Sequence, residues 1–142
     1  MPVERVGARY RNAFFALVLL ISASRIGFAG LFPLTGDEAY HWEWSRSPAF
    51  GYYDHPPMTA WLIRASARLF GGDSEMAVRL PAVFCLGAAA ILLFLLARYA
   101  ALQQGMSWNR ANRAGFLAGV MILCAPLYAG LSMYMSTDPP LV

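Results

Sequence analysis

Three long apolar segments constrain the fold of this chain more than any other feature. They cover residues 13–34, about 78–102 and about 115–135. Each has roughly the 20 residues that cross about 30 Å of hydrocarbon as a helix. Only 13% of the 142 residues are charged, whereas about 25% is usual in soluble proteins. We therefore expect an all-α membrane protein with three transmembrane helices.

A cleavable signal peptide is the competing interpretation of the first segment. Residues 13–34 form a longer apolar run than a signal core, and no small-x-small cleavage site precedes Asp37. We expect an uncleaved transmembrane helix. The basic pI of about 9.1 does not indicate nucleic-acid binding, because the arginines are scattered and most of them flank apolar segments.

The distribution of arginine predicts the orientation of the chain in the membrane. Basic residues dominate before the first segment and between the second and the third, whereas six acids lie between the first and the second. By the positive-inside rule, the N-terminus is cytoplasmic and the first connection, about residues 35–77, lies outside. The third segment then runs outward, so Asp37 and Asp138 reach the same membrane surface.

The outer connection has a helical pattern of its own. Prolines at positions 56 and 57 precede apolar residues spaced at i, i+3, i+4, i+7 and i+11, and two glycines follow at positions 71 and 72. The apolar positions are Met58, Trp61, Leu62, Ala65 and Leu69. The spacing predicts an amphipathic helix over about 57–70, which is too short to span a bilayer and suited to lie at its surface.

Four short motifs occur in order along the chain. They read GDEAYHWEWS at 36–45, GYYDHPP at 51–57, RLP at 79–81 and TDPPL at 137–141. With these motifs the chain resembles the N-terminal part of the bacterial PMT-type membrane glycosyltransferases. These are relatives of glycosyltransferase family 39 and of the aminoarabinose transferases, within the GT-C superfamily. The resemblance covers nearly the whole chain.

The resemblance implies a multi-pass enzyme of the bacterial inner (plasma) membrane. Such an enzyme moves a sugar from a polyprenyl-phosphate-linked donor to a lipid, glycan or protein acceptor at the outer face. Family members have about a dozen membrane helices, and this chain ends at Val142, where a fourth helix is expected. We therefore expect residues 1–142 to form the N-terminal part of one such domain and to be inactive alone. A small non-enzymatic membrane subunit, or a carrier of lipid-linked sugars, is the alternative.

The resemblance also implies roles for individual residues. Asp37 is expected to be the general base that accepts the proton of the attacking group. Asp138 is expected to share the site or to help hold a divalent ion, although two acids alone give too few oxygen ligands for one. Metal dependence therefore stays open, and a helix cap is the alternative role of Asp138.

Four further residues are candidates for substrate binding. Glu38 is expected to orient the acceptor or a neighbouring group. The remaining three are Tyr40, Tyr53 and His55. The tyrosines alternatively belong to an aromatic belt at the membrane surface, and His55 alternatively is a loop residue without a chemical role.

Overall fold

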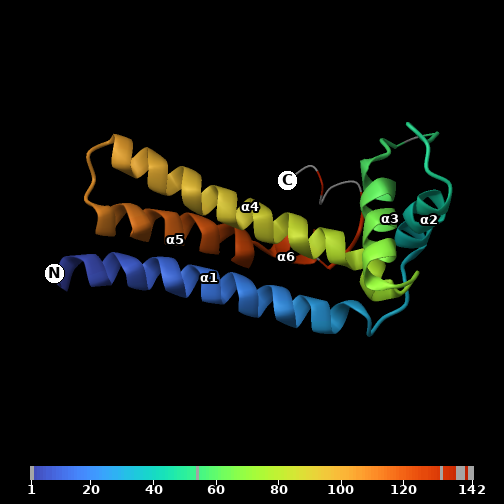
Figure 1. The fold of residues 1–142 in the computed structure, drawn as a ribbon, viewed down its shortest axis with the longest axis horizontal. Coiled ribbons are helices and arrows are strands. Elements are labelled where there is room, and N and C mark those ends of the chain that lie inside the picture. Colours follow the sequence, from blue (N-terminus) through green and yellow to red (C-terminus); the bar gives the residue numbers. More distant parts are fainter. Residues whose placement is uncertain (1, 54, 132, 137–139, 141–142) are drawn as a thin grey trace.

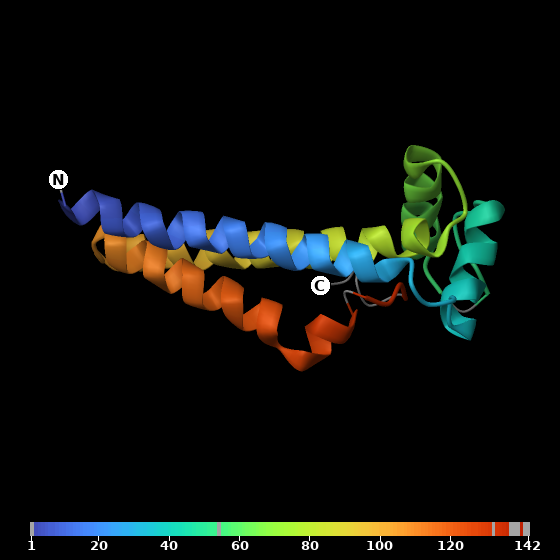
Figure 2. The same cartoon turned by 90° about the horizontal axis from the view of Figure 1, so that it is seen from below.

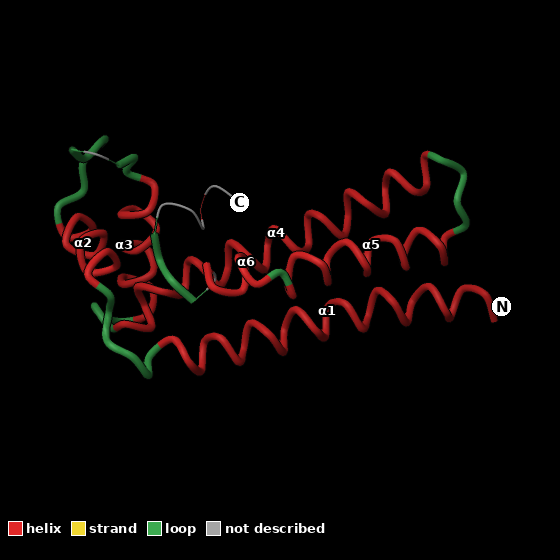
Figure 3. Tube along the Cα trace, turned by 180° about the vertical axis from the view of Figure 1, so that it is seen from behind, coloured by secondary structure: helices red, strands yellow, loops and turns green. Residues whose placement is uncertain are grey.

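The fold is a bundle of long helices with a pair of short helices at one end (Figure 1). The computed structural model describes residues 2–53, 55–131, 133–136 and 140. Within these ranges it contains six helices and no strand (Figure 3). The helices are α1 (Pro2–Ala29), α2 (Gly36–Arg46), α3 (Met58–Phe70), α4 (Glu75–Gln103), α5 (Trp108–Cys124) and α6 (Pro126–Leu131).

Helices α1, α4 and α5 run side by side and form the bundle (Figures 1 and 2). Among the described residues, two helical stretches have the length and apolar composition to cross a membrane, Gly7–Ala29 and Glu75–Gln103. These two stretches agree with the first two predicted spans. The third span is not found as one helix.

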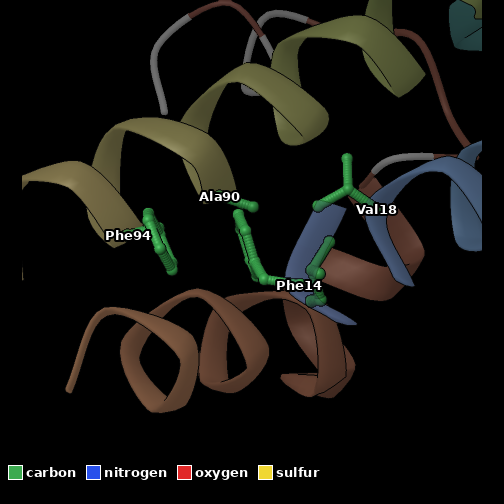
Figure 4. Packing of buried hydrophobic residues seen from close by; sticks show 5 residues of the cluster. Phe14, Val18, Ala90 and Phe94 are labelled. Atoms are coloured by element: carbon green, nitrogen blue, oxygen red, sulfur yellow. The ribbon is translucent and has the colours of Figure 1, made fainter. Parts of the chain in front are cut away.

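The bundle core is apolar and closely packed (Figure 4). Phe14 of α1 stacks on Phe94 of α4, with ring centroids 4.6 Å apart and planes 12° from parallel. A Cβ atom added at Gly115 of α5 would lie 2.7 Å from the backbone oxygen of Phe94. One added at Gly119 would collide with the Phe14 ring. The two glycines therefore allow α5 to approach its neighbours closely, and a larger side chain would force the helices apart.

The first predicted span, 13–34, is wrong at its C-terminal end, because α1 stops at Ala29. Pro33 disfavours a helical conformation at the residue before it and cannot donate a backbone hydrogen bond. The freed carbonyl groups find another donor, since Arg79 Nη1 donates to Ala29 O at 2.7 Å and to Phe32 O at 2.8 Å. A loop therefore separates α1 from Asp37.

The third predicted span, 115–135, is also wrong as a single element. Helix α5 has 17 residues and ends at Cys124, and the next residue, Ala125, is extended with φ −64° and ψ 123°. Pro126 disfavours helix at Ala125 and then begins α6, which has only 6 residues and takes a different direction from α5 (Figure 2). Alone, α5 is shorter than the roughly 20 residues that a span requires.

The helix predicted over 57–70 is present as α3, which runs across the end of the bundle (Figure 1). Gly71, in the left-handed conformation with φ 81°, ends it. Helix α3 packs on both α2 and α4 and buries Thr59, Ala60, Ile63 and Ser66. Helix α2 was not predicted. Together α2 and α3 form what we call the end unit.

Candidate functional site

The two adjacent acids lie in the first turn of α2, where a capping box holds them. The Glu38 backbone N–H points at Thr35 Oγ1, 3.4 Å away, and the Thr35 backbone N–H donates to Glu38 Oε2 at 3.0 Å. This reciprocal pair satisfies backbone donors that the start of a helix leaves free. The helix dipole also favours negative charge in the first turn. The acids therefore begin a separate helix rather than ending α1.

Glu38 is fully buried and pairs with Arg79 of α4. Two parallel hydrogen bonds of 2.8 Å run from Arg79 Nε and Nη2 to the two carboxylate oxygens. The Met135 backbone N–H donates to the same carboxylate at 3.2 Å. Burial alone would raise the pKa of Glu38, but the hydrogen bonds from Arg79, Thr35 and Met135 outweigh it and hold this pKa below its ordinary value.

Arg79 connects three parts of the fold through this pair. Besides Glu38, it donates to the carbonyl oxygens of Ala29, Phe32 and Pro33 at 2.7, 2.8 and 3.0 Å. These bonds tie the end of α1 and the loop after it to α2 and α4. The bond from Met135 adds the segment after α6. The contacts of Glu38 and Arg79 therefore fix the position of α2 at the end of the bundle.

Asp37 has a different environment from its neighbour. Its side chain is 47% exposed, and Tyr134 donates a hydrogen bond of 2.7 Å to its Oδ2 atom. Burial, followed by this bond to Asp37, raises the pKa of Tyr134, so the phenol remains a donor at neutral pH. The other carboxylate oxygen, Oδ1, lies 3.9 Å from His41 Nδ1, which is too far for a hydrogen bond. Within the described part of the chain, Oδ1 accepts no hydrogen bond.

The segment after α6 reaches the start of α2 across 97 residues of sequence. Thr59 Oγ1 of α3 donates to Ser136 O at 3.2 Å, and both residues are buried. Tyr134 and Met135 contact the two acids of α2. Asp138, the second predicted catalytic residue, lies outside the described residues. The structure therefore brings Tyr134, Met135 and Ser136 to the end unit.

A cluster of aromatic rings follows the acids on α2. The Trp44 ring stacks on Tyr52, with centroids 4.6 Å apart and planes 6° from parallel, and lies 4.2 Å from Tyr40. The His55 ring is 5.3 Å from His41 and 5.7 Å from Trp44. The loop between α2 and α3 therefore folds back onto the α2 helix.

Comparison with known proteins identifies the family. Residues 54–142 match the profile of the dolichyl-phosphate-mannose-protein mannosyltransferases. This chain belongs to that family. The matched region contains Arg79 and Tyr134, which hold Glu38 and Asp37 in place. No solved structure matches the chain significantly.

Two curated relatives of this mannosyltransferase family are similar to the chain. A lipid A galacturonosyltransferase of Rhizobium johnstonii is 33% identical over 102 residues, which cover 72% of this chain and 20% of the relative. An undecaprenyl phosphate-alpha-4-amino-4-deoxy-L-arabinose arabinosyl transferase of Serratia proteamaculans is 34% identical over 88 residues, covering 62% and 14%. The chain therefore spans a fifth or less of the length of these relatives. Membership of this family and the long apolar helices make it a membrane protein.

The predicted substrate-binding residues of this family member lie in different places. Tyr40 and His55 belong to the aromatic cluster, and Glu38 is buried with both carboxylate oxygens bonded to the protein. Tyr53 is fully exposed. The described residues contain no group of three or more His, Cys, Asp or Glu side chains that could hold a metal ion.

Three residues with clear contacts at the site were given no role from the sequence. Thr35 was detectable, because Thr-x-x-Glu is the sequence signature of a capping box. Arg79 carried a signal as the first residue of the RLP motif at 79–81 and as an arginine near the start of an apolar segment, where a charge requires a partner. Tyr134 had no local signal, since its contact with Asp37 depends on how α6 and the residues after it fold back.

Proposed function

We propose that this protein is a glycosyltransferase that acts at the outer face of the membrane in which it lies. It moves a sugar from a polyprenyl-phosphate-linked donor to a lipid, glycan or protein acceptor. The proposal rests on the environment of Asp37, whose side chain is exposed. One carboxylate oxygen accepts a hydrogen bond from Tyr134. The other accepts no hydrogen bond from the described residues. Membership of the mannosyltransferase family and the transferase names of both relatives support it.

The chemistry assigned to Asp37 is general-base catalysis. As the acceptor hydroxyl or amine attacks the anomeric carbon, the bond from that carbon to the donor phosphate breaks and the proton of the acceptor passes to Asp37. The Oδ1 atom is the one placed to take the proton, because Tyr134 occupies Oδ2. Tyr134 holds the carboxylate in one orientation, which favours a productive geometry.

The other predicted residues have supporting parts in this proposal. Glu38 positions α2, and with it Asp37, through Arg79 rather than by contact with substrate. Tyr40 and His55 belong to an aromatic surface suited to stacking on a sugar or an isoprenoid chain, and Tyr53 adds an exposed ring beside it. The proposal keeps Asp138, which lies outside the described residues, as the second acid of the site.

The proposed setting is the bacterial inner membrane with a cytoplasmic N-terminus. Helices α1 and α4 span it, α5 and α6 together make the third crossing, and α3 lies in the outer interface. The arginine distribution supports this orientation. In a variant with Cys85 and Cys124 replaced by serine, Ser47→Cys in the loop after α2 is expected to react with a membrane-impermeant reagent in intact cells. Labelling only after the cells are opened would reverse the orientation.

The decisive experiment is Asp37→Asn in the native full-length protein. The amide keeps the shape of the side chain but cannot accept the proton, so turnover is expected to fall by about 10² or more. Donor affinity is expected to change little, because the lost interaction matters mainly as the proton moves. Both quantities are measured on the same membrane preparation.

The matched control is Glu43→Gln on the same helix. Glu43 is exposed and lies 3.5 Å from Arg46, so this variant makes the same change of charge away from the site and should retain full turnover. Near-normal turnover of Asp37→Asn would remove Asp37 from the mechanism, and Asp138 would become the leading candidate for the base.

A further inference from the structure

A second polar site lies at the other end of α2, where the C-terminal turns of α2 and α3 meet. A hollow of about 250 Å³ opens there. Its lining consists of Ser45, Arg46, Arg64, Ala67, Arg68, Gly72 and Asp73. Arg46 is nine residues after Asp37, which corresponds to about 13 Å along a helix at 1.5 Å per residue. The hollow is therefore separate from the Asp37 site.

Two arginines of this hollow, Arg46 and Arg64, have defined side-chain contacts, and two of the three, Arg64 and Arg68, have no paired carboxylate in the described ranges. Arg64 Nη1 donates to the carbonyl oxygens of Ser45 and Arg46 at 2.9 and 3.1 Å. Arg46 lies over the Trp42 ring at 5.2 Å and forms a surface ion pair with Glu43. No carboxylate in the described ranges forms an ion pair with Arg64 or Arg68.

The balance of charge around the hollow favours an anion. Three arginines and a single acidic residue, Asp73, line the hollow, and of the arginines only Arg46 forms an ion pair with a described residue, Glu43. Guanidinium groups match the oxygens of a phosphate in geometry and charge, and they form stronger hydrogen bonds to it than neutral donors do. We propose that Arg46, Arg64 and Arg68 form a binding site for a phosphate group.

The position of the hollow on α3 agrees with this ligand. Arg64, Ala67 and Arg68 lie on one side of the helix. On the opposite side, α3 and α4 enclose an apolar hollow of about 200 Å³, lined by residues including Leu62, Ala65 and Phe84. The inference rests here on the proposed interfacial position of α3. With its apolar side toward hydrocarbon, the arginine side lies at the depth of the lipid phosphates.

The phosphate has two possible sources, a lipid headgroup and free phosphate in solution. Both are tested with the native protein purified in a neutral detergent and titrated by calorimetry. The probes are inorganic phosphate, dihexanoyl phosphatidic acid, and dihexanoylglycerol as the phosphate-free lipid. We expect phosphatidic acid to bind and dihexanoylglycerol not to bind. Tighter binding of phosphatidic acid than of inorganic phosphate assigns the site to a lipid, and equal affinity assigns it to the phosphate group alone.

Arg68→Gln is the informative variant, because Arg68 has no side-chain partner among the described residues and its loss leaves the fold intact. Binding of both phosphate probes is expected to weaken about tenfold. Asp73→Asn removes the opposing charge and is expected to tighten binding severalfold. Arg110→Gln is the matched control, since Arg110 is exposed in the first turn of α5, a helix that begins at the opposite end of the bundle (Figure 1).

The outcome does not depend on the catalytic assignment. Asp37→Asn is expected to bind the phosphate probes like the unaltered protein, whatever its turnover. If Asp37→Asn proves fully active while Arg68→Gln loses affinity, the phosphate site stands and the assignment of the base fails. Equal affinities for Arg68→Gln, Arg110→Gln and the unaltered protein, with each variant shown to be folded by circular dichroism, would overturn the phosphate site.

Discussion

The bundle of α1, α4 and α5 and the end unit of α2 and α3 are held by different interactions. In the bundle, apolar rings stack and glycines permit close contact, as at Phe14, Phe94 and Gly119. The end unit is attached through a buried ion pair between Glu38 and Arg79, with six further hydrogen bonds from or to these groups. The chemistry proposed here belongs to the end unit.

This difference has a physical basis. Apolar packing depends on volume and has no direction, so several side chains of the right size satisfy it. Hydrogen bonds to a buried charge depend on angle and distance, and therefore fix a group more narrowly. A carboxylate that must meet a reacting atom gains from such a fixed support. Each prediction below separates the two regions by altering one of them.

The largest effect is expected for Glu38→Gln in the end unit. The substitution leaves the Arg79 guanidinium buried without a counter-charge, and breaking a buried pair in this way costs about 3–5 kcal/mol. Hydrogen exchange is expected to rise in α2 and at Met135, while the Phe14 region of the bundle stays protected. The control is Glu43→Gln, an exposed partner of Arg46, with an expected change below about 0.5 kcal/mol.

Acid should have the same regional effect in the unaltered protein. The hydrogen bonds described above lower the pKa of Glu38 below the ordinary value of 4.5. Their stabilisation is complete above that value and is lost as the pH falls through the lower pKa of the folded protein. Exchange in α2 should therefore increase first on acidification, and Glu38→Gln should remove this step. Simultaneous loss of protection in both regions would contradict the distinction between them.

Gly119→Ala is expected to have an intermediate effect, confined to the bundle. The added methyl group would collide with the Phe14 ring, and overpacking of this kind costs about 1–3 kcal/mol. Thermal unfolding in detergent measures it. Gly27→Ala in α1 is the control, because a Cβ atom there meets nothing within 4 Å; the change should be neutral or slightly stabilising. Equal melting temperatures for the two variants would show that the bundle is loosely packed.

Sequence patterns predicted the bundle better than the end unit, and the reason is the range of the interactions. Helices α1 and α4 correspond to apolar runs, and α3 corresponds to a periodic pattern. These signals are local in the sequence, so they predict the helices without knowledge of tertiary contacts. The two helix ends that were not predicted are caused by Pro33 and Pro126. Their effects are also local and were detectable. Helix α2 was missed although its capping box is present in the sequence, because the apolar run before it dominated the interpretation.

The site could be predicted only in part, because its contacts join residues far apart in the sequence. Asp37 and Glu38 were recognised together, but nothing in the sequence distinguishes a buried acid from an exposed one beside it. Their difference arises from Arg79, 41 residues away from Glu38, and from Tyr134, 97 residues away from Asp37. Such partners are set by tertiary packing, which no local pattern encodes.

The smallest effect is expected for Tyr134→Phe, which removes the hydrogen bond between the segment after α6 and the end unit. The ring stays, but Asp37 Oδ2 loses its donor, at a cost of about 1 kcal/mol. Turnover is expected to fall about threefold to tenfold, well short of the loss expected for Asp37→Asn.

Tyr128→Phe on α6 provides the matched control, because the Tyr128 hydroxyl makes no hydrogen bond within the described residues. Both variants lose the same atom, so a loss of turnover in Tyr134→Phe alone separates positioning of Asp37 from a general effect on the segment around α6. If the two variants have equal turnover, Tyr134 only packs against the end unit. The orientation of Asp37 would then depend on the capping box of α2 and on the Glu38–Arg79 pair beneath it.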